Sequence, residues 1–362
     1  MRSLFIFQHN SDDDRRAYPG AQFGASFADL TFQARFGINT AFYKEIHRQN
    51  NETIFSLQEI SDTSREQLKE FFASLGLSAL TTKYALDKGS FNYVFAYNPA
   101  IFDVTETSQV YYTQSGQSIT DEERNALTKA EKIERHFGTE FEKSAQLARL
   151  RHKESGEIFL VVNTHPGLEL RHRLLAMQKL CDALSQEKGM VILTGDFNQF
   201  DSRVPVPTIY DDQIGILKEH GFHWASEGLS RVGMKSTFVC KPFDIFHLIP
   251  TEELSAFKTA LQAITDSHEQ RQFVVRFIQE KSLNLVGTCL DAIFTRALPQ
   301  ATTVEVNAFT MFYRKIVNTG QIENTREFQD RYLQHFIDNR ADANVEPPLG
   351  SDHIALATTI KF

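Results

Sequence analysis

The sequence has few cysteines, and they are poorly placed for any structure built on cysteine. There are three in 362 residues, Cys181, Cys240 and Cys289, an odd number set far apart. This pattern excludes a disulfide framework and the close C-x-x-C spacing of a zinc site. The composition is therefore typical of a protein in a reducing compartment.

Long apolar runs are also missing. No run approaches the ~20 residues that a membrane-spanning helix needs. The N-terminal stretch MRSLFIFQHNSDDDRR has too short an apolar run for a signal peptide and turns acidic at once, so we interpret it as a first strand. We therefore predict a cytoplasmic location, with export by a non-classical route as the alternative.

An excess of positive charge is absent too, since the formal net charge is −8. This excludes a globally basic nucleic-acid-binding surface, although a local patch remains open. What the chain does have is phenylalanine, 31 residues of it, within a hydrophobic content of 41%. We therefore expect a large core in which aromatic packing carries much of the burial.

Strands and helices are interleaved along the chain. The expected strands are 3–8, 53–57, 92–97, 145–152, 158–163, 190–194, 235–239, 289–295 and 353–360. The expected helices are 28–48, 62–76, 120–137, 171–186, 251–264, 269–280 and 324–339. Thr63 and Glu66 have the spacing of a capping box, and 145–163 has the pattern of a hairpin. This order predicts a mixed sheet, or two sheets, covered by helices.

Polar residues of similar chemistry follow five of these strands or precede them. They are Gln8-His9-Asn10-Ser11-Asp12, Gln58-Glu59, Asn163-Thr164-His165, Gly195-Asp196-Phe197-Asn198 and Gly350-Ser351-Asp352-His353. Asp196 and Asn198 should share one face of an extended chain, because strand side chains repeat every second residue. One can then accept a proton from water while the other donates to a phosphoryl oxygen. Gly195 lets the backbone approach closely.

If these strand ends converge, they form a pocket of hard oxygen ligands with two histidines. Such a pocket suits Mg²⁺, which prefers carboxylate oxygens, keeps several waters and often binds a substrate phosphate as well. Mn²⁺ and Ca²⁺ are the alternative ions. The histidines can supply proton transfer or stabilise phosphate.

Five motifs resemble those of the endonuclease/exonuclease/phosphatase superfamily, which includes pancreatic deoxyribonuclease and exonuclease III. They are LQE (57–59), NTH (163–165), LTGDFN (193–198), LDAIF (290–294) and SDH (351–353), in the family's order and spread over nearly the whole chain. The resemblance implies an α/β fold, a four-layered α/β sandwich of two mixed, mainly antiparallel sheets flanked by helices. It implies one catalytic domain over 1–362, with a helical insert at about 244–288.

The resemblance also implies metal-binding roles. Glu59 matches the metal-binding glutamate, and Asn10 matches an asparagine that helps to hold metal or phosphate. Asp12 falls where nucleases of the family often have a second acid. Asp352 would bind metal or lie beside it. Asp12 also has a simpler interpretation, because Asp12-Asp13-Asp14 reads equally well as a solvated acidic loop.

Catalytic roles are implied for five residues. His165 would hydrogen-bond a non-bridging phosphate oxygen or act as general acid. Asp196 would orient or deprotonate the attacking water, and Asn198 would steady the transition state. His353 would be the second catalytic histidine, oriented by Asp291. The implied chemistry is in-line attack of water on phosphorus with one or two Mg²⁺ ions.

The sequence departs from the family's pattern in several places. Gln-His stands before Asn10 instead of the commoner aromatic residue, and Pro166 follows His165 where many members have leucine. In the nuclease branch His165 has a carboxylate partner near the strand expected at 92–97. Only Phe91 and Asn92 stand there, so the sequence identifies no partner.

The substrate is the least determined part of this interpretation. A nuclease-like phosphodiesterase is favoured by Asn10, Asp12 and the segment YVFAYNPAIF (93–102). A phosphoinositide or inositol phosphatase is disfavoured because its GDxNYR and WCDR sequences are absent, and lipid phosphodiesterases such as sphingomyelinase are usually secreted. The partner is thus a phosphate ester, either nucleic acid or a phosphorylated lipid or small molecule. A non-catalytic binding protein on the same fold is the alternative from another class.

Overall fold

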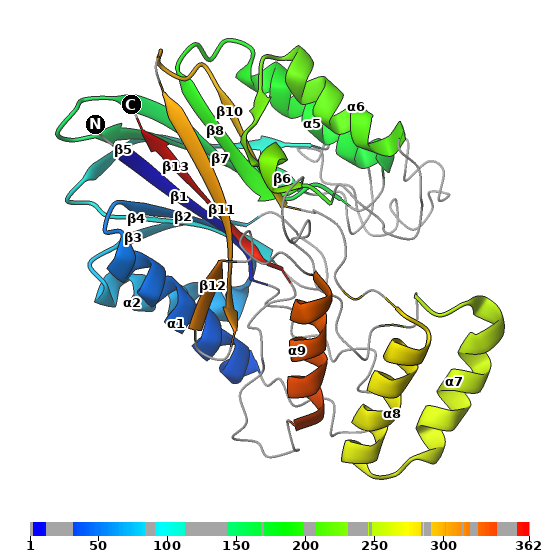
Figure 1. The fold of residues 1–362 in the computed structure, drawn as a ribbon. Helices are drawn as coiled ribbons and strands as arrows, with labels where there is room; N and C mark the ends of the chain where they lie inside the picture. The colour runs from blue at the N-terminus through cyan, green and yellow to red at the C-terminus, as the bar shows by residue number, and fades with distance from the viewer. Residues whose placement is uncertain are drawn as a thin grey trace, which may run out of the picture.

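Two β-sheets lie face to face, and helices cover their outer faces (Figure 1). The computed structural model describes residues 3–11, 32–83, 91–112, 143–167, 170–198, 208–230, 245, 248–283, 285, 291–300, 302–312, 315–318, 325–338 and 353–361. The expected helix at 120–137 and strand at 235–239 lie outside these residues, as do Asp12 and Asp352. No helix in the described ranges is long and apolar enough to cross a membrane.

The first sheet has seven strands in the order β12-β11-β13-β1-β2-β4-β3. They are β1 (Ser3–Asn10), β2 (Thr53–Ser61), β3 (Ser78–Lys83), β4 (Phe91–Tyr97), β11 (Thr303–Phe312), β12 (Lys315–Asn318) and β13 (Ala355–Lys361). β1 runs parallel to β2 and antiparallel to β13, and the remaining neighbours are antiparallel. The first and last described strands of the chain are therefore partners at the centre of this sheet.

The second sheet has six strands in the order β5-β6-β7-β8-β10-β9. They are β5 (Phe102–Tyr111), β6 (Ser144–His152), β7 (Ile158–Thr164), β8 (Met190–Asp196), β9 (His223–Trp224) and β10 (Asp291–Arg296). β7 and β8 are parallel and the other neighbours antiparallel, and β6–β7 is the expected hairpin. Both sheets are thus mixed and mainly antiparallel, as predicted.

Three groups of buried side chains fill the spaces between the layers. One lies between the sheets and includes Ile6, Phe95, Val161 and Ile192. A second joins the first sheet to α1 (Phe32–Gln49) and α2 (Asp62–Ser74). A third joins the second sheet to α5 (Leu170–Leu184) and α6 (Thr208–Glu219). Helix, sheet, sheet and helix form the four-layered α/β sandwich that the sequence predicted.

Helices α7 (Thr251–Ala263) and α8 (Ser267–Glu280) occupy the expected helical insert, and Figure 1 shows them beside α9 (Thr325–Asp338), away from the four layers. A short 3₁₀ helix (Ala225–Ser230) follows β9. Phe257 of α7 packs against Phe273 and Phe277 of α8, with ring centroids 5.4 Å and 4.5 Å apart. Phe257 is buried and the other two rings are partly buried, which explains why the apolar spacing in this segment predicted helices correctly. The assignment of 1–362 to one domain stays a prediction.

The predicted capping box at the start of α2 is wrong. Strand β2 continues to Ser61, four residues beyond its expected end, and the helix begins at once at Asp62. Ser61 is therefore the N-cap, and its Oγ accepts from the backbone N–H of Ser64 at 3.2 Å. A side-chain oxygen at this position satisfies one of the free N–H groups of the first turn. The helix ends as expected, just before Gly76 with φ 76°.

Candidate active site

Sheet topology brings the polar strand ends to one edge of the sandwich. Asn10 ends β1, Glu59 lies near the end of β2, and Asp196 ends β8. β10 is antiparallel to β8, so its first residue, Asp291, pairs with Asp196. β13 is antiparallel to β1 in the same way, which places His353 at this edge just before the strand.

Asp196 is the residue that most of the others contact. Asn10 Nδ2 donates to its Oδ2 at 3.0 Å, and the backbone N–H of Asn198 donates to its Oδ1 at 2.8 Å. His165 Nε2 lies 3.4 Å from Oδ2, and His353 Nε2 lies 3.8 Å from the same oxygen. The Asp196 side chain is only 2% exposed. The structure thus gathers two histidines and a carboxamide around one buried carboxylate.

Asp291 and His353 form the predicted pair. His353 Nδ1 lies 2.8 Å from Asp291 Oδ2, and Asp291 is fully buried. His9 supports the segment, because its Nε2 lies 3.3 Å from the His353 carbonyl and its Nδ1 lies 3.0 Å from the Tyr43 hydroxyl. The imidazole of His353 is therefore oriented from its Nδ1 side while Nε2 faces Asp196.

Glu59 reaches the site through an irregularity in β2. The pairing of β2 with β4 shifts between Leu57 and Ile60, and Glu59 has φ 55°. Bulges of this kind turn one side chain away from the regular alternation. Glu59 Oε1 lies 3.6 Å from His165 Nε2, and the Glu59 side chain is 23% exposed. The carboxylates beside His165 Nε2 thus come from β2 and β8. Asn92 instead donates to the Ile60 carbonyl at 3.0 Å, which supports the bulge.

The expectation that Asp196 and Asn198 share one face of an extended chain is wrong. β8 ends at Asp196, and the chain turns through Asn198 with φ 49°, a conformation that asparagine tolerates better than most residues. The Asn198 side chain points back, and its Nδ2 donates to the Pro166 carbonyl at 2.8 Å. The prediction for Gly195 is confirmed, because a Cβ there would lie 2.0 Å from the Thr164 carbonyl oxygen.

Burial dominates the electrostatics of the site. Burial raises the pKa of the Asp196 carboxyl, a shift that His353 opposes and Asp291 reinforces. Burial also lowers the pKa of His165 well below its ordinary range, and the electrostatic interactions with Lys143 and with the protonated form of His353 lower that pKa further. The structure therefore favours a neutral imidazole at His165 and a carboxylate at Asp196 that is a stronger base than an exposed aspartate.

These shifts predict an acid-side loss of stability. The unfolded chain can bind a proton at His165 as the pH falls below the ordinary value of 6.5, whereas the folded protein resists it. The free energy of unfolding should therefore fall below that pH. Asp196 acts with the opposite sign, because its raised pKa lowers stability as the pH rises above 3.8. We expect the Tm of metal-free His165→Gln to fall less than that of the wild type between neutral and mildly acid pH.

Calorimetry at a series of pH values measures this difference. His223→Gln, at an exposed histidine of β9, is the matched control and should follow the wild-type curve. An unchanged acid-side slope in His165→Gln would contradict the assignment of His165 as a neutral buried group.

Lys143 is a residue at the site that the sequence did not reveal. It lies just before β6, and its Nζ donates to the Pro166 carbonyl at 3.1 Å. The same carbonyl accepts from Asn198 Nδ2, so the ammonium and the carboxamide are close neighbours. Its charge also acts on both His165 and Asp196. No motif marked this lysine, because only the pairing of β6 with β7 brings it to the edge where His165 lies.

The residues that the structure describes fit a hard cation only in part. Glu59 offers a partly exposed carboxylate and Asn10 a carboxamide oxygen, both of the oxygen class that Mg²⁺ prefers. Within the described ranges, no group of three or more histidines, cysteines, aspartates or glutamates is arranged to hold a metal ion. Mg²⁺ commonly uses one or two carboxylates and several waters, so Glu59 with Asn10 is compatible with it.

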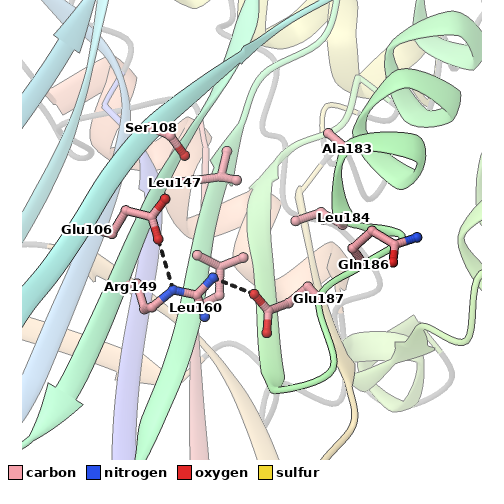
Figure 2. Close-up of a pocket in the computed structure, with 9 residues that line it drawn as sticks. All are labelled: Glu106, Ser108, Leu147, Arg149, Leu160, Ala183, Leu184, Gln186 and Glu187. Carbon is pink, nitrogen blue, oxygen red and sulfur yellow. Dashed lines mark hydrogen bonds and ion pairs between the residues drawn. The ribbon is translucent and has the colours of Figure 1, made fainter.

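A pocket of about 310 Å³ lies elsewhere, on the outer face of the second sheet near the end of α5 (Figure 2). Arg149 crosses it, with NH2 2.5 Å from Glu187 and Nε 3.2 Å from Glu106. Leu147, Leu160 and neighbouring residues complete the lining. None of the lining residues belongs to the site around Asp196, so this pocket is separate from the candidate active site.

Solved structures with a similar fold include endonuclease/exonuclease/phosphatase family proteins. One from Bacteroides vulgatus aligns with a TM-score of 0.56 and 14% identity over 100% of both chains. A mannosyl-6-phosphatase from Bacteroides thetaiotaomicron aligns at 0.52 and 14% over 99% of this chain and 100% of its own. Zebrafish (D. rerio) TDP2 complexed with a single-stranded DNA product aligns at 0.52 and 11% over 100% of both. No family model and no curated protein matches the sequence. The chain has the endonuclease/exonuclease/phosphatase fold.

Proposed function

We propose that the protein is a metal-dependent phosphoesterase that hydrolyses a phosphate ester by in-line attack of water. The observation that carries this proposal is the group around Asp196: a buried carboxylate contacted by Asn10, two histidines and the backbone of Asn198. Burial makes this carboxylate a stronger base than an exposed one. The two imidazoles lie close enough to contact a water molecule that the carboxylate would activate.

Each side chain has a role that its contacts support. Asp196 orients the attacking water and accepts its proton. The neutral His165 donates a hydrogen bond to a non-bridging phosphate oxygen. His353, held by Asp291, presents its Nε2 to the same space. Asn198 steadies the loop at Pro166, and the loop in turn holds Lys143 beside the site.

Glu59 and Asn10 would hold Mg²⁺, with Asp12 and Asp352 as further proposed ligands. The ion would supply Lewis-acid stabilisation of the negative charge that develops on the phosphoryl oxygens. Asn10 also has a second role, because its Nδ2 donates to the Asp196 carboxylate and fixes the orientation of that carboxylate.

A nuclease-like phosphodiesterase is the activity we favour, since the site combines Asn10, Glu59 and two histidines on a fold that zebrafish TDP2 shares with its DNA product bound. The mannosyl-6-phosphatase of the same fold supports a phosphomonoesterase as the second candidate. Phosphoinositides and other phospholipids are the further substrate classes.

Hydrolysis assays test these alternatives. Plasmid DNA, single-stranded RNA, phosphoinositides and a sugar phosphate would be incubated side by side with Mg²⁺ or EDTA, with wild type and the Asp196→Asn variant. Turnover of one class by the Mg²⁺-loaded wild type alone would support the proposal and identify the substrate. Equal turnover by Asp196→Asn would overturn it. No turnover of any substrate, with Mg²⁺ still bound in calorimetry, would favour a non-catalytic binding protein.

Lys143 should strengthen substrate binding through its positive charge. We expect Lys143→Ala to lower kcat/KM about tenfold, mainly by raising KM, since a hydrogen bond from a charged donor is worth ~1.5–3 kcal/mol. Steady-state kinetics measure the effect. Lys153→Ala is the matched control, because Lys153 follows the opposite end of β6 and also donates to a proline carbonyl, that of Pro99. Equal kinetics for the two variants would remove Lys143 from the site.

A further inference from the structure

Behind the site, three buried amide side chains form a hydrogen-bonded chain between the two sheets. Gln8 Nε2 donates to Gln58 Oε1 at 2.8 Å, and Gln58 Nε2 donates to Asn163 Oδ1 at 2.6 Å. Asn163 Nδ2 donates to the Leu57 carbonyl at 2.9 Å. At the other end, Gln8 Nε2 donates to Asp291 Oδ1 at 2.7 Å. All three amides are fully buried, so water does not compete for these bonds.

The Leu57 carbonyl determines which way each amide of this hydrogen-bonded chain is oriented. A backbone carbonyl only accepts, so Asn163 turns Nδ2 toward Leu57 and leaves Oδ1 for Gln58. Gln58 must then present Nε2 to Asn163 and Oε1 to Gln8. Gln8 consequently donates with both hydrogens of its amide, one to Gln58 and one to Asp291. The reverse orientation of Gln8 would set its oxygen against two acceptors.

Gln8 itself shows that its donors are what matters at this position. Its Oε1 is buried and has no hydrogen-bond partner among the described residues. An unmatched buried acceptor is destabilising. Gln8 therefore acts as a donor to two acceptors, and its own oxygen makes no hydrogen bond to the described residues.

We propose that this amide chain is a positioning device that holds His353 in the tautomer with its hydrogen on Nδ1. Gln8 donates to Asp291 Oδ1 and so stabilises the ionised carboxylate, whose Oδ2 only accepts. The imidazole then supplies the hydrogen of the 2.8 Å contact from Nδ1. His353 Nε2 then carries a lone pair toward Asp196 and Asn10. The tautomer follows from the contacts alone, and its catalytic consequence rests on the proposed function.

The chain also links parts of the site that the sheets keep apart. Gln58 directly precedes Glu59 at the bulge of β2, and Asn163 lies two residues before His165 on β7. Gln8 lies two residues before Asn10 on β1. A change at Gln8 should therefore act on His353 through Asp291 without removing any group that touches substrate.

Two substitutions separate the donor from the shape of the side chain. Gln8→Glu keeps the shape and replaces the donating amide with an acceptor, and Gln8→Met keeps the length with neither. Gln146 offers matched controls, since it is a buried glutamine of β6 that donates to the Leu80 carbonyl and the Thr82 hydroxyl. Its Oε1 is likewise buried without a partner in the described residues.

Nitrogen NMR of protein labelled with ¹⁵N-histidine reports the tautomer directly, and His353→Gln assigns the signal. We expect the Nδ1–H form in the wild type and in Gln146→Met, and a mixture of tautomers in both Gln8 variants. On a substrate that the wild type hydrolyses, kcat should fall about tenfold or more in the Gln8 variants with KM within about twofold.

An unchanged tautomer in folded Gln8→Met would overturn the proposal, whatever its activity. A mixed tautomer with unchanged kcat would overturn the catalytic consequence. If the wild type hydrolyses none of the substrates, the proposed function fails. The NMR spectrum still decides whether the amide chain positions His353.

Discussion

Asp196→Asn should abolish hydrolysis while the protein stays folded. We expect kcat to fall by about 10³-fold, because the variant loses the general base and the charge that both histidines face. The loss of stability should stay within about 1–3 kcal/mol, because burial already disfavours the charged form, whereas an amide keeps only one of the two acceptor oxygens that Asn10 and Asn198 use. Steady-state kinetics on the substrate found in the hydrolysis assay, together with the Tm, measure both parts of the expectation.

Asp103→Asn is the control for this substitution. Asp103 is an aspartate of β5 that pairs with Arg151 at 2.7 Å and Lys153 at 3.3 Å on the outside of the second sheet. Exposed pairs of this kind contribute little to stability. The control should therefore keep wild-type activity, and more than about a tenth of wild-type kcat in Asp196→Asn would argue against Asp196 as the base.

Gly195→Ala should have the largest effect on stability. An alanine Cβ would lie 2.0 Å from the carbonyl oxygen of Thr164, and the carbonyl belongs to the parallel partner strand, so it cannot move without disturbing the β7–β8 pairing. We expect a loss of at least ~3 kcal/mol in the free energy of unfolding, the range of severe core overpacking. Urea denaturation measures it.

Gly37→Ala is the matched control within α1. A Cβ there meets nothing within 4 Å, and alanine is favoured over glycine in a helix by about 1 kcal/mol. The control should be neutral or slightly stabilising. If Gly195→Ala unfolds at the same urea concentration as the wild type, the close approach of β7 and β8 at this residue is not what holds the site in place.

Most of the candidate site residues could be picked out from the sequence because they follow or precede a buried strand. Asn10, Glu59, Asp196 and Asp291 stand where apolar runs meet polar residues, and sheet topology carries those boundaries to one edge. The convergence itself stayed conditional in the sequence, because it depends on the order and pairing of strands that lie far apart in the chain. The left-handed turn at Asn198 was not predictable, because the regular alternation of a strand gives no sign of where it stops.

Strands β5 and β11 were not predicted from the sequence, for different reasons. β5 is an edge strand with a largely exposed, polar middle, so it lacks the apolar alternation by which strands are found. β11 did carry that signal, since Val304, Val306 and Ala308 alternate with polar residues.

The bond from Gln8 to Asp291 spans 283 residues of sequence, and no local pattern can indicate a contact of that range.

The pairing of β1 with β13 has a consequence for synthesis on the ribosome. β1 is made long before one of its two neighbours in the sheet, residues 355–361, and His353 lies two residues before that strand. A nascent chain therefore carries β1 with one edge open until more than 340 further residues have been added. Unpaired strand edges of this kind promote aggregation during folding. Chaperone occupancy of ribosome-bound chains should persist until β13 emerges, and catalytic activity should appear only with it.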